Sequence, residues 1–327
     1  MLNYLVRRVL YGALILVGVN FATFFLFFSV NSPDNMARLN IGGKRVTQEL
    51  IDKWKAERGY DKPLYWNEGE RGAARFTDTI FWDRSISLFA LRFGRADSEA
   101  AGDIGYEVAR RMRASVQLAL PIFALQVIAS VAFALLLVLF RNSRLDLAGV
   151  LLCVVMLSIS SLIYIIVGQF AFARLMKLFP ISGFASSLDV VRFLVLPVLL
   201  SVLARLGAEG RLYRAMLLEE IGKDYVRTAR AKGLAESAVL SRHVLRNALI
   251  PIITSAGSYL PYVFLGSLVF ESFFGIPGLG AYTIEAIGKQ DFAIVRSMVF
   301  VGSLLFIASY TLIDVAYTWA DPRVRLG

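Results

Sequence analysis

The sequence predicts an all-α polytopic membrane protein with six transmembrane helices. Of its 327 residues, 57% are hydrophobic, and the mean hydropathy is +0.61. These side chains gather in long blocks without charge, whereas a water-soluble protein of this size would scatter them. An uncharged block of about 20 residues can cross the hydrocarbon core of a bilayer as a helix. Composition and blocks together exclude a disordered or fibrous chain and favour an integral membrane protein.

Six apolar blocks are the predicted spans. Four of them contain no charged residue, and the first is too long for the core of a signal peptide, which has roughly 7 to 15 residues. The other two are shorter, and the charged side chains that bound them can extend toward the interface or face protein. The uncharged blocks are 9–33, 114–140, 147–173 and 247–270, and the shorter ones are 193–204 and 297–313.

Basic residues in the short loops set the predicted orientation. With the amino terminus inside, every cytoplasmic piece is basic, and the cytoplasmic loop 209–246 alone holds eight Lys and Arg. Segment 34–113 is then external (periplasmic), and its fifteen basic and thirteen acidic residues do not contradict this, because long loops cross largely regardless of charge. Both termini are expected in the cytoplasm. The predicted domains are 1–33 with the first helix, the external segment 34–113, and a five-helix core at 114–327.

The net charge of +10 comes from 35 Lys and Arg against 25 Asp and Glu. In a soluble protein, such an excess of basic residues would suggest that the protein binds nucleic acid. Because every predicted cytoplasmic piece is basic and basic residues collect at cytoplasmic helix ends, the positive-inside bias explains an excess of this kind. We therefore expect membrane lipid around this chain and no nucleic acid partner.

Within the external segment, stretch 47–55 is typical of a short surface helix. Leu50, Ile51 and Trp54 are spaced like one apolar face. Gly59 follows, and glycine is a common helix terminator. We expect this helix to pack as a cap over the membrane mouth.

The loop between the fourth and fifth predicted spans predicts a helical hairpin. Leu218, Ile221, Tyr225 and Ala229 are spaced as one apolar face of a helix. The pattern breaks at 232–234, where Gly233 suits a turn because glycine adopts positive φ without a Cβ clash. A second helix is expected over 236–247. An apolar stripe exposed on a protruding hairpin would indicate a surface for a partner.

Two runs in this loop carry a family resemblance: DYVRTARAKGL at 224–234 and RHVLRNALIP at 242–251. They resemble the EAA loop of bacterial ABC importer permeases, and more narrowly the B-type subunits of the oligopeptide and dipeptide permeases. The runs YLVRR at 4–8, FGR at 93–95, DS at 97–98 and DPR at 321–323 are also similar to that branch. The Glu-Ala-Ala that names the loop is replaced by Arg-Thr-Ala at 227–229, a substitution similar to that of the peptide branch.

The resemblance implies a type I ABC importer permease fold in the bacterial inner (cytoplasmic) membrane. It implies coupling to an ATPase subunit through the hairpin residues Tyr225, Arg227, Thr228, Ala229, Lys232, Gly233 and Leu234. The implied partners are a second, homologous permease in a heterodimer, two ATPase subunits and an extracytoplasmic solute-binding protein that delivers peptides. ATP and Mg would bind to the ATPase partners, with no cofactor on this chain.

The sequence is consistent with ATP binding on partner subunits, and it leaves alternative functions open. Stretch 42–44 is the nearest approach to a phosphate-binding P-loop, and it lacks the spacing and the hydroxyl residue of that motif. The only histidine, His243, has no neighbouring metal ligands. The alternatives are import of a peptide-like antibiotic or another small solute, and a proton-coupled secondary carrier that uses Asp314 near the inner end of the sixth span. The sequence shows no pair of Ser and His, no paired intramembrane carboxylates and no cluster of metal ligands at a plausible depth that would favour an intramembrane enzyme.

Overall fold

The computed structural model describes the backbone of residues 2–42, 46–98, 102–185, 189–259 and 267–320. Side chains are described for the same residues except 2–5 and 314–320. Over these ranges the regular structure is helical, with one isolated bridge between Arg95 and Asp103. The chain divides into two compact units: unit 1 is mainly Met1–Arg113 with Gly278–Thr311, and unit 2 is Ala114–Pro277 with Leu312–Leu326.

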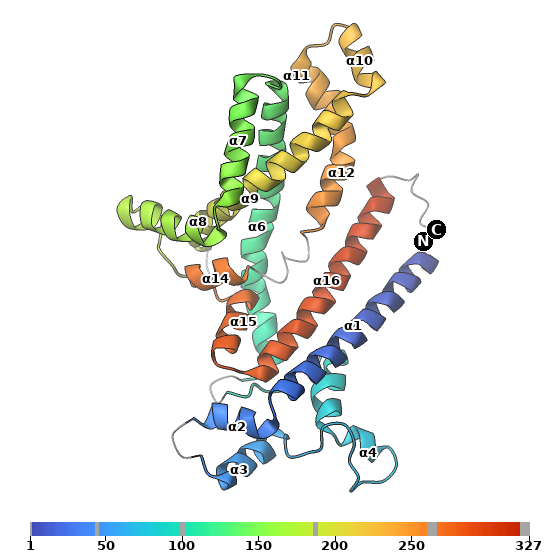
Figure 1. Cartoon of the computed structure of the whole chain (residues 1–327), viewed down its shortest axis with the longest axis vertical. Coiled ribbons are helices and arrows are strands. Elements are labelled where there is room, and N and C mark those ends of the chain that lie inside the picture. The colour runs from blue at the N-terminus through green and yellow to red at the C-terminus, as the bar shows by residue number, and fades with distance from the viewer. Residues whose placement is uncertain (1, 43–45, 99–101, 186–188, 260–266, 321–327) are drawn as a thin grey trace. The chain divides into compact units, whose positions relative to one another are not determined.

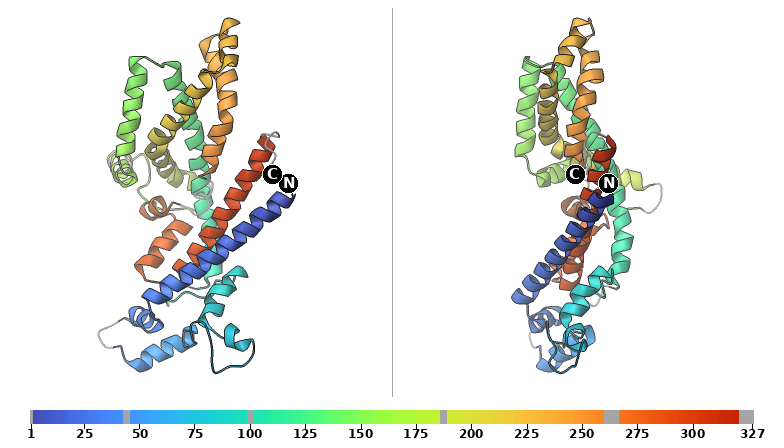
Figure 2. Two further views of the ribbon diagram at one scale, coloured as in Figure 1. Left: turned by 45° about the vertical axis from the view of Figure 1, so that its right-hand side comes forward. Right: turned by 90° about the vertical axis from the view of Figure 1, so that its right-hand side faces the viewer.

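Two long helices dominate unit 1. Helix α1 spans Leu2–Val30 and α16 spans Phe292–Ala320, and they run side by side (Figures 1 and 2). Their contact depends on Gly12, because a Cβ at this position would lie 2.6 Å from Ile307 Cγ2. The rings of Phe27 and Phe292 meet at 5.8 Å between centroids. A glycine in the first span thus lets the backbone of α1 approach the last span closely.

Short helices make up the rest of unit 1. They are α2 Pro33–Ile41, α3 Gln48–Arg58, α4 Ala74–Thr77, the π-helical turn η1 Trp82–Ile86, α5 Ser87–Phe89 and α15 Leu279–Gly288. The predicted surface helix is therefore present as α3, and Gly59 ends it with φ +68°. Ile51 and Trp54 are buried, whereas Leu50, also expected on the apolar face, is 46% exposed.

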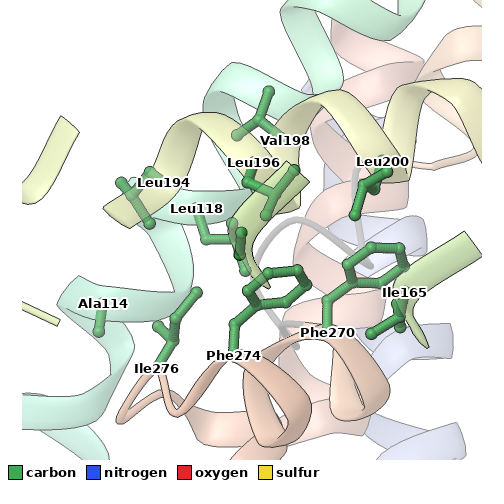
Figure 3. Close-up of a cluster of buried hydrophobic side chains, with 11 residues drawn as sticks. Ala114, Leu118, Ile165, Leu194, Leu196, Val198, Leu200, Phe270, Phe274 and Ile276 are labelled. Atoms are coloured by element: carbon green, nitrogen blue, oxygen red, sulfur yellow. The ribbon is translucent and has the colours of Figure 1, made fainter. Parts of the chain in front are cut away.

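Helix α6 runs over Ile104–Leu139, and most of it belongs to unit 2. The other helices of unit 2 are α7 Arg144–Ser158, α8 Ser161–Gly168, the π-helical η2 Gln169–Leu175, α9 Val190–Ile221, α10 Asp224–Ala231, α11 Glu236–Val239, the π-helical η3 Leu240–Val244, α12 Leu245–Gly257 and α14 Leu268–Phe274. Apolar side chains of α6, α8, α9 and α14 meet in one buried cluster (Figure 3). Its members include Leu118, Ile165, Leu196, Leu200 and Phe274.

The structure corrects the prediction of one continuous helix over 147–173. The chain bends by 91° between α7 and the segment that begins with α8. Ile159 is extended at the break, and the hydroxyl of Ser160 accepts a hydrogen bond from the Leu162 N–H, which caps α8. Serine competes with helix continuation because its hydroxyl bonds nearby backbone groups. An uncharged block is therefore no guarantee of an unbroken helix.

Length and composition qualify four helices as membrane spans: Val6–Val30, Ile104–Leu139, Val190–Ile221 and Phe292–Ile313. The bent pair Arg144–Ser158 and Ser161–Leu175 adds a fifth if it is one span. The chain is thus an all-helical membrane protein with four to five candidate spans in the part that the structure describes. The predicted block 247–270 lies partly outside the described residues, and six spans stay a prediction.

Candidate functional site

The predicted hairpin is present at one end of unit 2, where α9 ends and α12 approaches (Figure 1). Helix α10 forms its first arm, and α11 with η3 forms the second. Gly233 lies between them with φ +76°, which confirms the expected positive-φ turn. Its N–H donates to the carbonyl of Arg230 at 2.9 Å. Residue 233 therefore sits at a turn that favours glycine for a conformational reason.

The first arm is shorter than predicted. Leu218 and Ile221 belong to α9, and Gly222 and Lys223 separate them from Tyr225 on α10, with Lys223 in an extended conformation. The break brings the Tyr225 hydroxyl back onto Glu220, to which it donates a hydrogen bond of 2.5 Å. Burial and this bond raise the pKa of Tyr225 to about 12. A spacing that fits one helical face thus also fits two helices joined by a short bend.

The apolar side of the hairpin is covered by the chain itself. Val226, Ala229, Val239, Leu240 and Val244 are all buried. They join side chains of α6, α9 and α12 in a core that we call the hairpin cluster, whose other members are Ala134, Val138, Tyr213, Leu217, Ala248 and Ile252. The prediction that this apolar stripe is exposed is therefore wrong, because residues of the same chain pack over it. Burial of this side fixes the hairpin to three helices of the bundle.

Charged groups tie the two arms together. Glu236 accepts two hydrogen bonds from Arg230, at 2.9 and 3.0 Å, and one from Arg141 at 3.0 Å. Arg141 lies between α6 and α7, so this cluster also holds the hairpin to that turn. The Arg230 guanidinium is the main cause that lowers the pKa of Glu236, and Arg141 adds to it. The sequence analysis missed these residues, although Arg230 and Glu236 flank the turn symmetrically.

The surface left exposed at the tip is small and basic. Of the seven coupling residues that the resemblance implies, Tyr225 is half-buried and Ala229 is buried. The other five are exposed: Arg227, Thr228, Lys232, Gly233 and Leu234. The Arg227 side chain is 76% exposed, and Leu234 is 41% exposed. This tip can dock into a groove on another protein without disturbing the core beneath it.

In the described ranges, no group of three or more His, Cys, Asp or Glu side chains is arranged to hold a metal ion. His243 is half-buried in η3. Asp314 falls among the residues whose side chains lie outside the described part. The geometry of the hairpin is thus one of packing and surface contact.

Comparison with known proteins identifies related sequences over the whole chain. The family model of binding-protein-dependent transport system inner membrane components matches residues 126–326, and the model of the amino-terminal part of such components matches residues 1–90. A candidate peptide transport system permease of Brucella abortus (strain 2308) is 31% identical over 326 residues, which cover 98% of each chain. The dipeptide transport system permease DppB of Bacillus subtilis (strain 168) is 30% identical over 100% of this chain and 99% of its own. The di/tripeptide transport system permease DppB of Pseudomonas aeruginosa (strain UCBPP-PA14) is 31% identical over 99% of both chains.

Proposed function

The chain belongs to the family of binding-protein-dependent transport system inner membrane components, and we propose that it is the permease subunit of an ATP-driven importer of peptides. It is a multi-pass transport subunit of the inner membrane and not an enzyme. The substrate class rests on the full-length similarity to permeases named for peptides, dipeptides and tripeptides. An extracytoplasmic binding protein delivers the peptide to the outer mouth.

The hairpin at Gly233 is the proposed relay between ATP hydrolysis and the spans. The observation that carries this proposal is that its tip is exposed while its other side is fixed by packing to α6, α9 and α12. Because the hairpin is anchored in this way, it moves together with the helices of the bundle. A groove on the ATPase subunit that moves the tip of the hairpin would therefore also move these helices. Arg227, Thr228, Lys232, Gly233 and Leu234 form the contact. Tyr225 and Ala229 support it from within the hairpin.

Energy must come from partner subunits in this scheme. The sequence contains no phosphate-binding P-loop motif, so ATP and Mg bind to two ATPase subunits that receive the hairpins of two permeases. The chain pairs with a second, different permease of the same family. Six spans, with both termini in the cytoplasm, complete the topology and leave the hairpin on the ATPase side.

A thiol cross-linking experiment tests the relay. Cys153 is the only cysteine and is buried, so Cys153→Ser gives a background free of thiols. In that background, Leu234→Cys should cross-link to the ATPase subunit through a short thiol-reactive photo-cross-linker. Ser241→Cys is the matched control, since Ser241 is also exposed but lies outside the proposed contact. Equal cross-linking of both variants, or of neither, would contradict the proposed relay.

Uptake measurements separate this function from the alternatives. Vesicles that contain the chain with its partners should accumulate a labelled dipeptide only with ATP and the binding protein, and a protonophore should leave the initial rate unchanged. Uptake that follows a proton gradient without ATP would favour the secondary carrier at Asp314. Uptake of a peptide-like antibiotic in place of dipeptides would reassign the substrate class.

A further inference from the structure

Unit 2 contains a partly open cavity of about 380 Å³. Side chains of α6, α8, α9, α12 and α14 line it, and most of the wall is apolar, including Leu118 and Phe270. Figure 3 shows these two side chains within the buried apolar cluster of unit 2. This volume lies at the lower end of the range for small-molecule sites, roughly 300 to 1,000 Å³. An apolar cavity of this size with a few polar groups is the usual form of a ligand site.

Three buried polar atoms in residues that line this cavity have no hydrogen-bond partner. They are Gln126 Oε1, Ser201 Oγ and Glu209 Oε2. Their residues are 8%, 5% and 3% exposed, respectively. Leaving such a group unpaired costs about 1 to 3 kcal/mol, and a charged group costs more. These three atoms are themselves shielded from water, and their residues form part of the wall of this cavity. Polar groups inside a membrane bundle are costly and often mark a substrate path.

Charges of both signs line the same cavity. Arg205 and Glu209 lie four residues apart on α9, so their side chains leave the same face of the helix. They form no ion pair with each other in the part of the chain that the structure describes. The Arg205 guanidinium lies 4.2 Å from the ring centroid of Tyr259, and Glu209 interacts with the Tyr213 hydroxyl one turn along. Each charged residue thus has an aromatic neighbour, and both residues line the cavity.

We propose that this cavity is a binding site on the permease itself for a short zwitterionic peptide, with Glu209 receiving the terminal ammonium and Arg205 facing the terminal carboxylate. The Cβ atoms of residues four apart on a helix are about 5 to 6 Å apart. The ends of an extended dipeptide are separated by about 7 Å at 3.3 to 3.6 Å per residue. Two long side chains one turn apart can therefore reach both ends of a dipeptide. The proposal rests on the proposed function and adds a selectivity step after the binding protein.

A thiol-protection assay on the assembled transporter tests the site without depending on the binding protein. In the Cys153→Ser background, Ser201→Cys places a thiol in the cavity wall. Alanyl-phenylalanine should slow its modification by a small methanethiosulfonate reagent. N-acetyl-alanyl-phenylalanine, which lacks the ammonium, should protect only at far higher concentration. Equal protection by the two peptides, or none by either, would overturn the proposal.

The charge variants assign the two ends of the ligand. Glu209→Gln should raise the protecting concentration of alanyl-phenylalanine at least about tenfold, the effect of losing one charge-assisted hydrogen bond, and should leave that of the acetylated peptide unchanged. Arg205→Gln should likewise raise the protecting concentration of alanyl-phenylalanine. It should leave the protecting concentration of alanyl-phenylalanine amide, which lacks the free carboxylate, unchanged. Glu219→Gln is the matched control, because Glu219 is an exposed glutamate on the same helix, and it should behave like the parent.

Further measurements distinguish failure of the proposed site from misfolding of a variant and from failure of the proposed function. If Glu209→Gln is absent from the membrane, Glu209→Asp preserves the charge and should still distinguish the free from the acetylated peptide; loss of that distinction in a folded protein overturns the site. If the parent transporter imports alanyl-phenylalanine with ATP but the peptide gives no protection, the cavity proposal alone fails. If the parent imports no peptide, the proposed function fails.

Discussion

Replacement of Gly233 by valine tests whether the hairpin transmits energy. The backbone at this position has φ +76°, and a Cβ there would meet no atom of this chain within 4 Å. The cost within the chain is therefore backbone strain alone, about 1 to 2 kcal/mol for a residue with a Cβ in the left-handed region. The hairpin cluster beneath the turn contains eleven buried residues, and removing one large side chain from such a core costs about 2 to 5 kcal/mol. The variant should therefore stay folded.

Docking should suffer more than folding. If the tip docks on the ATPase as proposed, a valine side chain there would overpack the contact, which costs about 1 to 3 kcal/mol. Because about 1.4 kcal/mol corresponds to a factor of ten in an equilibrium, strain and overpacking together weaken docking by tenfold or more. We expect near-normal amounts of Gly233→Val in the membrane, with peptide uptake collapsed and substrate-stimulated ATP hydrolysis lost. Both are measured in vesicles that contain the complete transporter.

Three further variants separate strain from bulk. Gly233→Asn adds bulk while tolerating positive φ, so it should impair uptake through the contact. Gly222→Ala changes a neighbouring glycine with φ −71°, where a Cβ meets nothing closer than 3.6 Å, and it should behave like the parent. Ser241→Ala, outside the contact, should also be neutral. Normal transport by Gly233→Val at normal expression would refute the relay.

Reporter fusions after Arg144, Gly183 and Gly327 should give a cytoplasmic, an external and a cytoplasmic signal, and any other order would overturn the six-span topology. Ala229→Trp should lower thermal stability and membrane abundance, because Ala229 is only 4% exposed within the hairpin cluster and a larger side chain overpacks it by about 1 to 3 kcal/mol; unchanged melting would contradict this packing. The pKa of Glu236 is lowered from its ordinary value of 4.5, so its ion pairs stabilise the hairpin above that pH and lose their effect as the pH falls through the lower, folded pKa. Amide exchange in α10, corrected for the intrinsic rate, should therefore accelerate at acid pH in the parent and show no such step in Glu236→Gln.

Local conformational signals were readable from the sequence. Gly233 and Gly59 both have positive φ, as expected for a turn and a helix end, because the absence of a Cβ decides such positions with little help from distant residues. Four apolar blocks likewise lie largely within single helices, namely 9–33, 114–140, 193–204 and 297–313, since a bilayer requires every backbone group to be paired within the segment. The break at Ser160 had a local signal in the surrounding serines, but hydropathy alone does not register it.

The spacing of apolar residues in the sequence could not show whether the chain itself or a partner covers an apolar face. Ala229 lies on the apolar face that the sequence predicted, and the structure covers that face with Ala134, Val138 and other residues far away in the chain. An apolar stripe looks the same in the sequence whether it meets a partner or the chain itself. For the same reason the sequence did not mark Glu209 as a site residue, because its burial beside the cavity follows from the packing of several helices.

Tyr213 belongs both to the hairpin cluster and to the wall of the proposed peptide site. Its side chain is 1% exposed. Its hydroxyl interacts with Glu209, while its ring packs in the same core as Val226 and Leu240 of the hairpin. Close-packed interiors shift between discrete arrangements and do not deform continuously. If the hairpin is the relay and the cavity is the peptide site, a movement imposed on the hairpin cluster would therefore reach the cavity wall through Tyr213, because this residue belongs to both.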